Sequence, residues 1–477
     1  MRKYQYDAIV VGSGPNGLAA AITLARAGRS VLIYEANETI GGGIRSAELT
    51  LPGFTHDTCS TVQALTVVSP FFRSLPLAQL GVELAMPDAA VAHPLDDGTA
   101  AVLERSIAAT GETLGRDANA YRRLFEPLVQ NADALNADLL GPFPFPPRHP
   151  LLFARFALPG LLPARTLAEF AFKGENARGL FAGIAAHTML PLESLSTAAY
   201  GLALAVSAHA SGWPVVKGGS QNLANALAAY VRSLGGEIVA GHPVENIDEL
   251  PAARAYVFDV TPRQLLRIAG HRFPRGYYRA LEKFRYGPGV FKIDFALDGP
   301  VPWKAAGCSR AGTVHLGGTL AEISASERAV WNGQPSHRPY MLVVQPTLFD
   351  PTRAPYGKHT LWAYSHVPNG STYDMTEHMI AQIERFAPGF QDRIIAQHIM
   401  SPAEMQARNA NYIGGDINGG TADLWQLYTR PAARINPYTT PAADIFICSS
   451  STPPGGGVHG MCGYHAARAV LKNTRQV

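Results

Sequence analysis

The sequence has neither a run of like charges nor a pair of closely spaced cysteines, and each absence excludes a class of protein. Its formal net charge is only +3 over 477 residues. Its basic residues are scattered, so we expect no nucleic-acid partner. The four cysteines form no CxxC pair; they are Cys59, Cys308, Cys448 and Cys462. Neither a zinc site nor a redox-active disulfide is expected, and we predict that the protein binds no metal.

Long hydrophobic runs are also missing. The apolar run Ala8–Val11 is too short for the core of a signal peptide. A long stretch without Asp, Glu, Lys or Arg spans residues 194–216. Its serines and its Gly-Trp-Pro end suit a buried helix followed by a turn better than a membrane span. We expect a folded, cytoplasmic protein of rather apolar composition, with 47% hydrophobic and 16% charged residues.

A glycine-rich turn near the start of the chain is the most informative feature that is present. The turn Gly12–Gly17 reads Gly-Ser-Gly-Pro-Asn-Gly. An apolar strand at residues 8–11 precedes it, a helical pattern over residues 18–27 follows it, and a second apolar strand at residues 31–34 ends at Glu35. This order of strand, glycine turn, helix, strand and acidic residue is typical of a dinucleotide-binding fold. The sequence therefore predicts a Rossmann-like dinucleotide site.

Each residue type in this motif has a physical role. Gly12 permits the tight bend, Gly14 lets the backbone approach a pyrophosphate, and Gly17 lets the helix pack closely on the strand. The amino end of the helix offers free N–H groups and a positive dipole to the phosphates. Glu35 can accept hydrogen bonds from ribose hydroxyl groups.

A second glycine cluster, Gly41–Ser46, follows Glu35 and reads Gly-Gly-Gly-Ile-Arg-Ser. It resembles the second glycine pair of flavoproteins in the glutathione-reductase superfamily, notably the amine-oxidase and phytoene-desaturase branches. This resemblance implies FAD as the cofactor rather than NAD.

The last glycine-rich loop extends the resemblance over most of the chain. Residues 449–470 read SSSTPPGGGVHGMCGYHAARAV, a loop that opens a helix. Together with residues 185–227 and 414–441, this stretch is similar to the phytoene-desaturase-like FAD oxidoreductases. The similarity is greater to a bacterial group of unsettled substrates than to the carotenoid enzymes.

The resemblance implies an α/β fold, with a Rossmann-like FAD-binding domain of the glutathione-reductase type and an α+β substrate domain of mixed sheet and helices. The FAD-binding domain is expected to be assembled from residues 1–62, 213–270 and 411–477. The substrate domain is expected from residues 63–212 and 271–410.

The motifs and the resemblance together give a set of candidate FAD-binding residues. The first glycine turn would hold the pyrophosphate. The last loop and its helix would face the flavin ring, where the helix dipole stabilises negative charge on the reduced ring. In the family, the residue that matches Val244 contacts the adenine through its backbone. The full set is Gly12, Ser13, Gly14, Pro15, Asn16, Gly17, Glu35, Ala36, Gly42, Gly43, Arg45, Val244, Gly456, His459, Gly460 and Met461.

The last loop also departs from the family. Carotenoid desaturases usually carry Gly-Ala-Gly-Thr-His-Pro there, whereas this chain has Ser449–Pro454, with Pro453 in place of the imidazole. The departure argues against carotenoid desaturation. The chain has no cysteine pair and no second complete GxGxxG turn. We therefore expect electrons to leave to an external acceptor such as oxygen, a quinone or another carrier.

The sequence assigns no catalytic residue, but it offers three candidates. His459, in the last loop, could influence the flavin or the substrate, or it could satisfy a loop carbonyl. His56 and Asp57 follow a predicted strand and could lie near the ring, and a structural turn is the alternative for both.

Four further side chains have structural interpretations. Two histidines lie in apolar, helix-like surroundings typical of buried, hydrogen-bonded imidazoles, and two aromatic residues suit the core or a pocket wall. In chain order they are His187, His209, Tyr412 and Trp425.

The sequence therefore predicts a FAD-dependent oxidoreductase of the desaturase or dehydrogenase type. Its substrate is expected to be a hydrophobic, unsaturated or isoprenoid-like small molecule that exchanges a hydride with flavin N5. A flavin-dependent isomerase or saturase with the same pocket is an alternative, whereas an amine oxidase is disfavoured because the last motif follows the desaturase pattern. A non-catalytic lipid- or prenyl-binding protein of the Rab GDP-dissociation-inhibitor type is the alternative of another class. The oligomeric state is not predicted.

Residues 139–172 are rich in proline and aromatic side chains and contain no acidic residue before Glu169. They predict either a tightly packed corner or an apolar surface in peripheral contact with anionic lipid. In the second case Arg148, Arg155 and Arg165 would lie at the margin of the surface.

Overall fold

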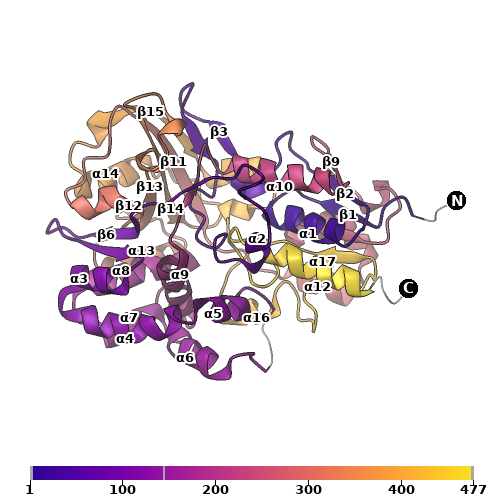
Figure 1. Ribbon diagram of the computed structural model, residues 1–477, viewed down its shortest axis with the longest axis horizontal. Coiled ribbons are helices and arrows are strands. Elements are labelled where there is room, and N and C mark those ends of the chain that lie inside the picture. Colours follow the sequence, from indigo (N-terminus) through magenta and orange to yellow (C-terminus); the bar gives the residue numbers. More distant parts are fainter. Residues whose placement is uncertain (1–3, 143–145, 474–477) are drawn as a thin grey trace.

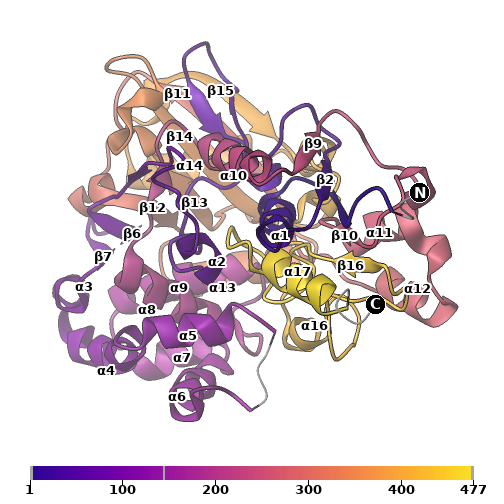
Figure 2. The same cartoon turned by 45° about the vertical axis from the view of Figure 1, so that its right-hand side comes forward.

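A parallel sheet of five strands organises one half of the protein in the computed structural model, which describes residues 4–142 and 146–473. The strand order is β16-β10-β1-β2-β9, and all neighbouring strands are parallel. The strands, in sheet order, are Ile445–Ile447, Tyr256–Phe258, Ala8–Val11, Val31–Tyr34 and Glu237–Val239. Three stretches of chain that are far apart in the sequence therefore meet in one sheet (Figures 1 and 2).

Helices bury both faces of this sheet. Ala8, Val10, Ile33 and Phe446 point to a face that packs with helices α1, α10 and α17, which Figure 2 shows stacked side by side. The alternate residues, such as Ile9, pack on the other face with helices α11 and α12. The five helices are Pro15–Arg26, Gln221–Ser233, Met461–Asn473, Pro262–Ala269 and Arg275–Glu282. Burial on both faces is the reason that these strands read as continuous apolar runs.

Helices α1 and α17 approach backbone to backbone. A Cβ added to Gly463 would lie 1.8 Å from the carbonyl oxygen of Asn16. Only glycine fits at this crossing, and α17 therefore supports the first turn of α1, where the glycine-rich turn ends.

A mixed sheet of seven strands forms the second half. Its order is β15-β11-β14-β13-β12-β6-β7, and only β6 and β12 pair in parallel. The strands, in sheet order, are Ile394–Met400, Gly289–Leu297, His359–Val367, Met341–Val344, Ala311–Leu316, Ala89–Pro94 and Ala100–Glu104. Two short antiparallel pairs join β3 with β4 and β5 with β8; these strands are Ser46–Glu48, Thr55–Asp57, Leu84–Ala85 and Val215–Val216.

A layer of helices lies beside the mixed sheet, at the lower left of Figure 1. It contains α3 to α9, which are Ile107–Leu114, Ala118–Val129, Ala132–Leu139, Pro150–Gly160, Ala164–Ala171, Glu175–Ala185 and Thr197–Ser211. The remaining helices are α2, α13, α14, α15 and α16, at Pro70–Arg73, Leu320–Trp331, Thr376–Phe386, Pro402–Arg408 and Leu424–Thr429.

Two details of the predicted secondary structure need correction. The first helix begins at Pro15 rather than at residue 18, because proline fits the first turn of a helix, where its missing N–H costs nothing. The sequence of residues 71–114 predicts alternating strands and turns, but Ile107–Leu114 is helical. The side chain of Ser106 caps this helix by accepting a hydrogen bond from the N–H of Ala109 at 3.2 Å. The predicted helix in residues 194–216 is confirmed as α9.

Helices α6 and α7 lie within the proline-rich stretch 139–172, of which residues 143–145 lie outside the described part of the chain. Leu151 and Phe170 are exposed, at 89% and 87% of their surfaces. Arg165, however, forms ion pairs with Glu169 and Glu193, so its charge is already compensated within the protein. Lipid contact by this surface stays a prediction.

Within residues 4–142 and 146–473, no single helix has both the length and the apolar composition to cross a membrane. The pair α6 and α7 meets these criteria only when taken together, and the two helices meet at an angle of 97°.

Candidate active site

A cavity of about 500 Å³ connects the two halves of the protein. At one end it is lined by residues at or just beyond the carboxyl ends of the parallel strands, among them Val11, Tyr34, Asp259 and Ser449. At the other end it is lined by strands β13 and β14 of the mixed sheet and by helix α9. Ligands of open parallel sheets bind outside the carboxyl ends of the strands, so this cavity is the candidate active site.

The first glycine turn forms one wall of the cavity. Gly12 has a φ of +104°, in the left-handed region that favours glycine. A Cβ on Gly17 would lie 2.0 Å from the carbonyl oxygen of Gly12, so this position also requires glycine. Gly14, the residue before α1, has no side chain that could cap the helix. The turn therefore presents backbone N–H groups and the positive end of a helix dipole to an anionic ligand.

Glu35 anchors the same turn from the end of β2. One carboxylate oxygen, Oε2, accepts hydrogen bonds from the N–H and the hydroxyl of Ser13, at 2.9 and 2.6 Å. The other oxygen, Oε1, accepts from the N–H and the side-chain amide of Asn37, at 2.9 and 3.0 Å. The Asn37 side chain lines the cavity, so it is the donor that a ribose hydroxyl would most readily replace.

The second glycine cluster lies in close contact with the first. Gly42 has a φ of +54°, and a Cβ there would lie 2.9 Å from the Cα of Gly14. A Cβ on Gly43 would lie 2.7 Å from the hydroxyl of Tyr412. The Arg45 side chain is held by the carbonyl of Gly42 at 3.0 Å, and does not itself line the cavity. The two clusters together make a narrow backbone cradle.

Asp259, which follows β10, is a site residue that the sequence analysis missed. It lies beneath the glycine turn, where its Oδ2 accepts a hydrogen bond of 2.8 Å from the N–H of Gly17. Burial, together with the nearby charge of Glu35, raises the pKa of Asp259 to about 7, although the hydrogen bond from Gly17 opposes the shift. The signal that could have identified Asp259 as a site residue is its position at the carboxyl end of a parallel strand, where ligands bind.

The last loop reaches the cavity through residues other than those predicted. Ser449, Ser450, Gly457 and Val458 line the cavity. The predicted residues of this loop do not line it; they are Gly456, His459, Gly460 and Met461. The loop is therefore close to the site, and flavin contact by the four predicted residues stays a prediction.

His459 is held inside its own loop, as in the alternative that it satisfies a loop carbonyl, and its influence on the flavin or the substrate stays a prediction. Its Nδ1 accepts a hydrogen bond of 3.0 Å from the N–H of Met461, and its Nε2 lies 3.1 Å from the carbonyl oxygen of Gly455. Burial lowers its pKa to about 4. The ring is neutral and fully engaged, so it shapes the loop.

His56 and Asp57 also lie outside the cavity lining. The Nε2 of His56 lies 2.9 Å from the hydroxyl of Thr50, and burial lowers its pKa to about 3. Asp57 is fully buried and forms an ion pair with Arg353. Burial alone would raise the pKa of Asp57, but the charge and hydrogen bond of Arg353 lower it below its ordinary value. These contacts favour a structural role for His56 and Asp57, and a catalytic role for either residue stays a prediction.

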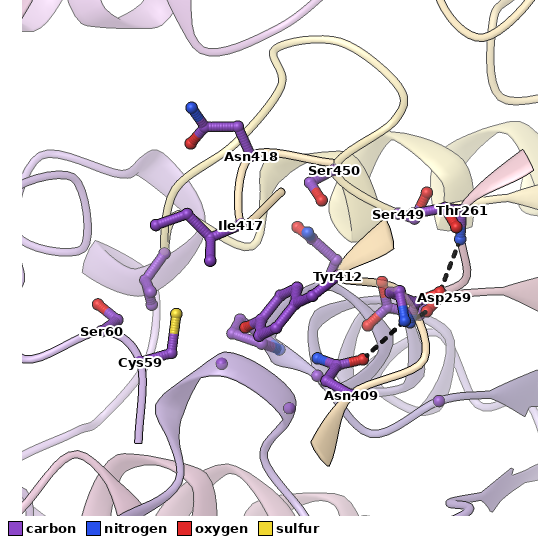
Figure 3. A pocket seen from close by; sticks show the side chains of 18 of the residues that line it. Cys59, Ser60, Asp259, Thr261, Asn409, Tyr412, Ile417, Asn418, Ser449 and Ser450 are labelled. Carbon is purple, nitrogen blue, oxygen red and sulfur yellow. Dashed lines mark hydrogen bonds between the residues drawn. The ribbon is translucent and has the colours of Figure 1, made fainter. Parts of the chain in front are cut away.

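The junction between the two ends of the cavity carries Tyr412, Cys59 and Asn418 (Figure 3). Tyr412 projects toward Cys59 in this view, and both residues line the cavity. Burial raises the pKa of both groups. At neutral pH the junction therefore holds a thiol and a phenol, and neither is a base.

Asn411, which also lines the cavity, links the junction to the cofactor end. Its Oδ1 accepts a hydrogen bond of 2.9 Å from the N–H of Thr261, and its Nδ2 donates to the carbonyl of Asp259 at 3.4 Å. The expectation that Tyr412 belongs to a pocket wall is confirmed. Trp425, by contrast, is 75% exposed and belongs to neither core nor wall.

The far end of the cavity has an apolar wall. It is lined by Leu204, Trp213, Leu342, Val344, Trp362 and Tyr364, with Thr313 and His187 as further polar members. Among the described lining residues, the only carboxylates are Glu35 and Asp259, and both lie at the opposite end. His209 lies outside this wall, buried and within 2.8 Å of the Tyr121 hydroxyl, as expected.

Comparisons with known proteins agree with this geometry. Residues 10–75 match the family model of the NAD(P)-binding Rossmann-like domain. A mouse protein, pyridine nucleotide-disulfide oxidoreductase domain-containing protein 2, is 27% identical over 100% of this chain and 95% of its own length. The hydroxyneurosporene desaturase of Cereibacter sphaeroides is 30% identical over 52% of each chain.

Solved structures share the fold at low sequence identity. An oxidoreductase from Methanosarcina mazei matches with a TM-score of 0.65 and 14% identity, over 98% of this chain and 99% of the other. Cyclohexylamine oxidase from Brevibacterium oxydans matches with a TM-score of 0.60 and 16% identity, over 98% and 99%. Taken with the relatives, these matches support an oxidoreductase enzyme with a Rossmann-type nucleotide-binding domain.

Proposed function

We propose that the protein is a FAD-dependent oxidoreductase of the desaturase or dehydrogenase type, acting on a neutral, hydrophobic, unsaturated or isoprenoid-like small molecule. The observation that carries this proposal is the continuity of one cavity from the glycine cradle to the apolar wall. A dinucleotide held at the cradle and an apolar molecule held at the wall would meet at the junction. The desaturase among the relatives supports the same reaction type.

The residues of the cradle fit a dinucleotide. Gly14 and Gly42 approach each other so closely that no side chain separates a ligand from the backbone. A ribose hydroxyl could replace the Asn37 side chain as a hydrogen-bond donor to Glu35. Val244, which the family resemblance assigns to the adenine, lines the cavity. Bound FAD would supply a hydride acceptor or donor at its ring nitrogen N5. The subclass that fits this arrangement is the glutathione-reductase type.

The chain's own contribution to the chemistry would be orientation and exclusion of water. The apolar wall desolvates a bound molecule, which favours hydride transfer over side reactions with water. Cys59 and Tyr412 keep their protons at neutral pH because burial raises their pKa. We therefore propose that neither acts as a strong base and that an external carrier takes the electrons.

The apolar wall at the far end of the cavity distinguishes this site from a binding site for an amine substrate. An ammonium group buried at the far end would find no carboxylate among the described lining residues, and a buried charge without a partner is costly. This observation favours a neutral substrate, although cyclohexylamine oxidase has a similar fold. A flavin-dependent isomerase or saturase would use the same wall.

The test begins with the absorption spectrum of the purified protein. We expect a flavin spectrum, or its recovery after addition of FAD, and anaerobic bleaching of the flavin by an unsaturated terpenoid but not by cyclohexylamine. A protein that stays colourless after addition of FAD would contradict the enzyme and favour a non-catalytic lipid-binding protein. Bleaching by cyclohexylamine alone would instead indicate an amine oxidase.

Asp259 gives a pH-dependent prediction for FAD affinity. An anionic pyrophosphate beside the glycine turn would favour the protonated form of Asp259 and raise its pKa beyond about 7. By linkage, affinity is then constant at low pH and falls as the pH rises through the pKa of the free protein. We expect the dissociation constant of FAD to rise roughly tenfold between about pH 7 and pH 9.

The matched variant is Asp259→Asn, which keeps an oxygen to accept the hydrogen bond from Gly17. We expect its FAD affinity to vary little over the same pH range, as measured by titration of the apoprotein with fluorescence detection. An equal loss of affinity in both proteins would show that another group titrates.

A further inference from the structure

A pair of histidines meets at the apolar end of the cavity. His187 follows α8, is half-buried and lines the cavity. Its Nε2 lies 3.1 Å from the Nε2 of His315, a fully buried residue of β12. The His187 ring also makes an edge-to-face contact with Trp213, at 5.9 Å between ring centroids. The position and orientation of this imidazole are therefore fixed from two sides.

The two imidazoles are neutral. Burial and the nearby His366 lower the pKa of His187 to about 3, and burial together with His187 and His93 lowers the pKa of His315 well below its ordinary value. A contact between two neutral Nε2 atoms requires one to donate and the other to accept. The direction of this hydrogen bond decides what His187 offers to the cavity.

His315 fixes that direction. Its Nδ1 is buried and has no hydrogen-bond partner among the described residues. A buried N–H without a partner is rarer in proteins than a buried acceptor without one. The single proton of His315 therefore belongs on Nε2, which donates to His187. His187 must then carry its own proton on Nδ1, the ring nitrogen that no residue described here engages.

We infer that His187 is a substrate-positioning residue that donates a hydrogen bond from Nδ1 to an oxygen atom on the substrate. This inference rests on the proposed function and narrows it. The substrate is a hydrophobic molecule that carries a hydroxyl, carbonyl or ether oxygen on the part lying against Trp213 and Leu204, rather than a pure hydrocarbon.

The apolar surroundings make such a donor selective. Leu204, Trp213, Leu342 and Val344 offer no alternative acceptor through their side chains. A hydrocarbon in the cavity would bury the Nδ1–H without a partner, and a site built to hydrogen-bond an oxygen discriminates strongly against the analogue that lacks it.

Two matched pairs of probes test the inference: limonene with perillyl alcohol, and farnesene with farnesol. The members of each pair share the carbon skeleton. Perillyl alcohol differs from limonene in one hydroxyl group, and farnesol carries a hydroxyl group where farnesene has an additional C=C double bond. Binding to the flavin-loaded protein is followed by quenching of tryptophan fluorescence, because Trp213 and Trp362 line the cavity. We expect each alcohol to bind about three- to tenfold more tightly than its hydrocarbon.

The variants are His187→Phe and His187→Gln. Phenylalanine keeps a ring of similar size and removes the donor, so we expect the preference for the alcohol to vanish while the hydrocarbon still binds. Glutamine offers both an acceptor to His315 and a donor to the ligand, so we expect it to keep most of the preference. Flavin content shows whether each variant has kept its fold.

The outcomes separate this inference from the proposed function. Equal binding of alcohol and hydrocarbon by the parent protein would overturn the role of His187 and leave a hydrophobic site intact. A preference that persists in His187→Phe would overturn it as well. If the parent protein binds none of the four probes, the hydrophobic substrate and the role of His187 are both refuted.

Discussion

Replacing Gly14 by valine is expected to give a folded protein that has lost its flavin. Gly14 has φ −65° and ψ 174°, an extended conformation that valine adopts without strain. The new Cβ would lie 2.7 Å from Oδ2 of Asp259, the movable end of a side chain. It would also stand where the backbone must approach the pyrophosphate. We expect the flavin absorbance per unit of protein to fall at least roughly tenfold.

Substitutions at two further glycines serve as comparisons for Gly14→Val. Gly276 lies exposed in α12 with no atom within 4 Å of an added Cβ. Gly276→Ala should keep its flavin and gain about 0.5–1 kcal/mol of stability from the better helix former. Gly17→Ala should lose both fold and flavin, because its Cβ would meet the backbone carbonyl of Gly12 at 2.0 Å. A yellow Gly14→Val protein would contradict the placement of the pyrophosphate.

A second large effect is expected from Arg353→Met. Arg353 is fully buried and donates hydrogen bonds to Asp57, to Asp350 at 3.0 Å and to the carbonyl of Val216 at 2.6 Å. Methionine would leave two buried carboxylates without their cation. Breaking a buried ion pair in this way costs about 3–5 kcal/mol. We expect a fall of several degrees in the midpoint of thermal unfolding at neutral pH.

Arg393→Met is the matched control. Arg393 pairs with Asp298 at 3.5 Å on the surface, where both side chains are exposed. Such pairs contribute about 0–1 kcal/mol, so the midpoint should hardly move. Because the pKa of Asp57 is lowered in the folded state, its contribution is present at neutral pH and is lost on acidification. Similar midpoints for the two variants at neutral pH would contradict the bridging role of Arg353.

The cofactor end could be predicted from sequence because its signals are local. Gly12, Gly17 and Glu35 are spaced by the geometry of one strand, one turn and one helix, so a short window of sequence records the site. Strands Ala8–Val11 and Val31–Tyr34 appear where the apolar runs placed them. The same signals do not describe contacts with distant parts of the chain, which is why Asp259 was missed.

The apolar end could not be predicted in this way. His187 and His315 are far apart in sequence and meet only because α8 packs beside the mixed sheet. His459 and Asp57 show the converse, because each has a suggestive local setting but is engaged within the protein: His459 by its own loop and Asp57 by a distant partner. Asp57 is bound by Arg353, almost three hundred residues later, as a structural anion. Which of these polar residues face the cavity was set by tertiary packing.

The backbone contact of Gly463 with Asn16 has a consequence for the order of events in biosynthesis. The two residues are separated by about 450 positions, and contacts of such high order form slowly. Strand β16 and helix α17 leave the ribosome after every other described element. The first glycine turn is therefore synthesised early but gains its final support late. Cofactor loading should consequently follow release of nearly the whole chain, and nascent chains that stop before β16 should be unable to retain flavin.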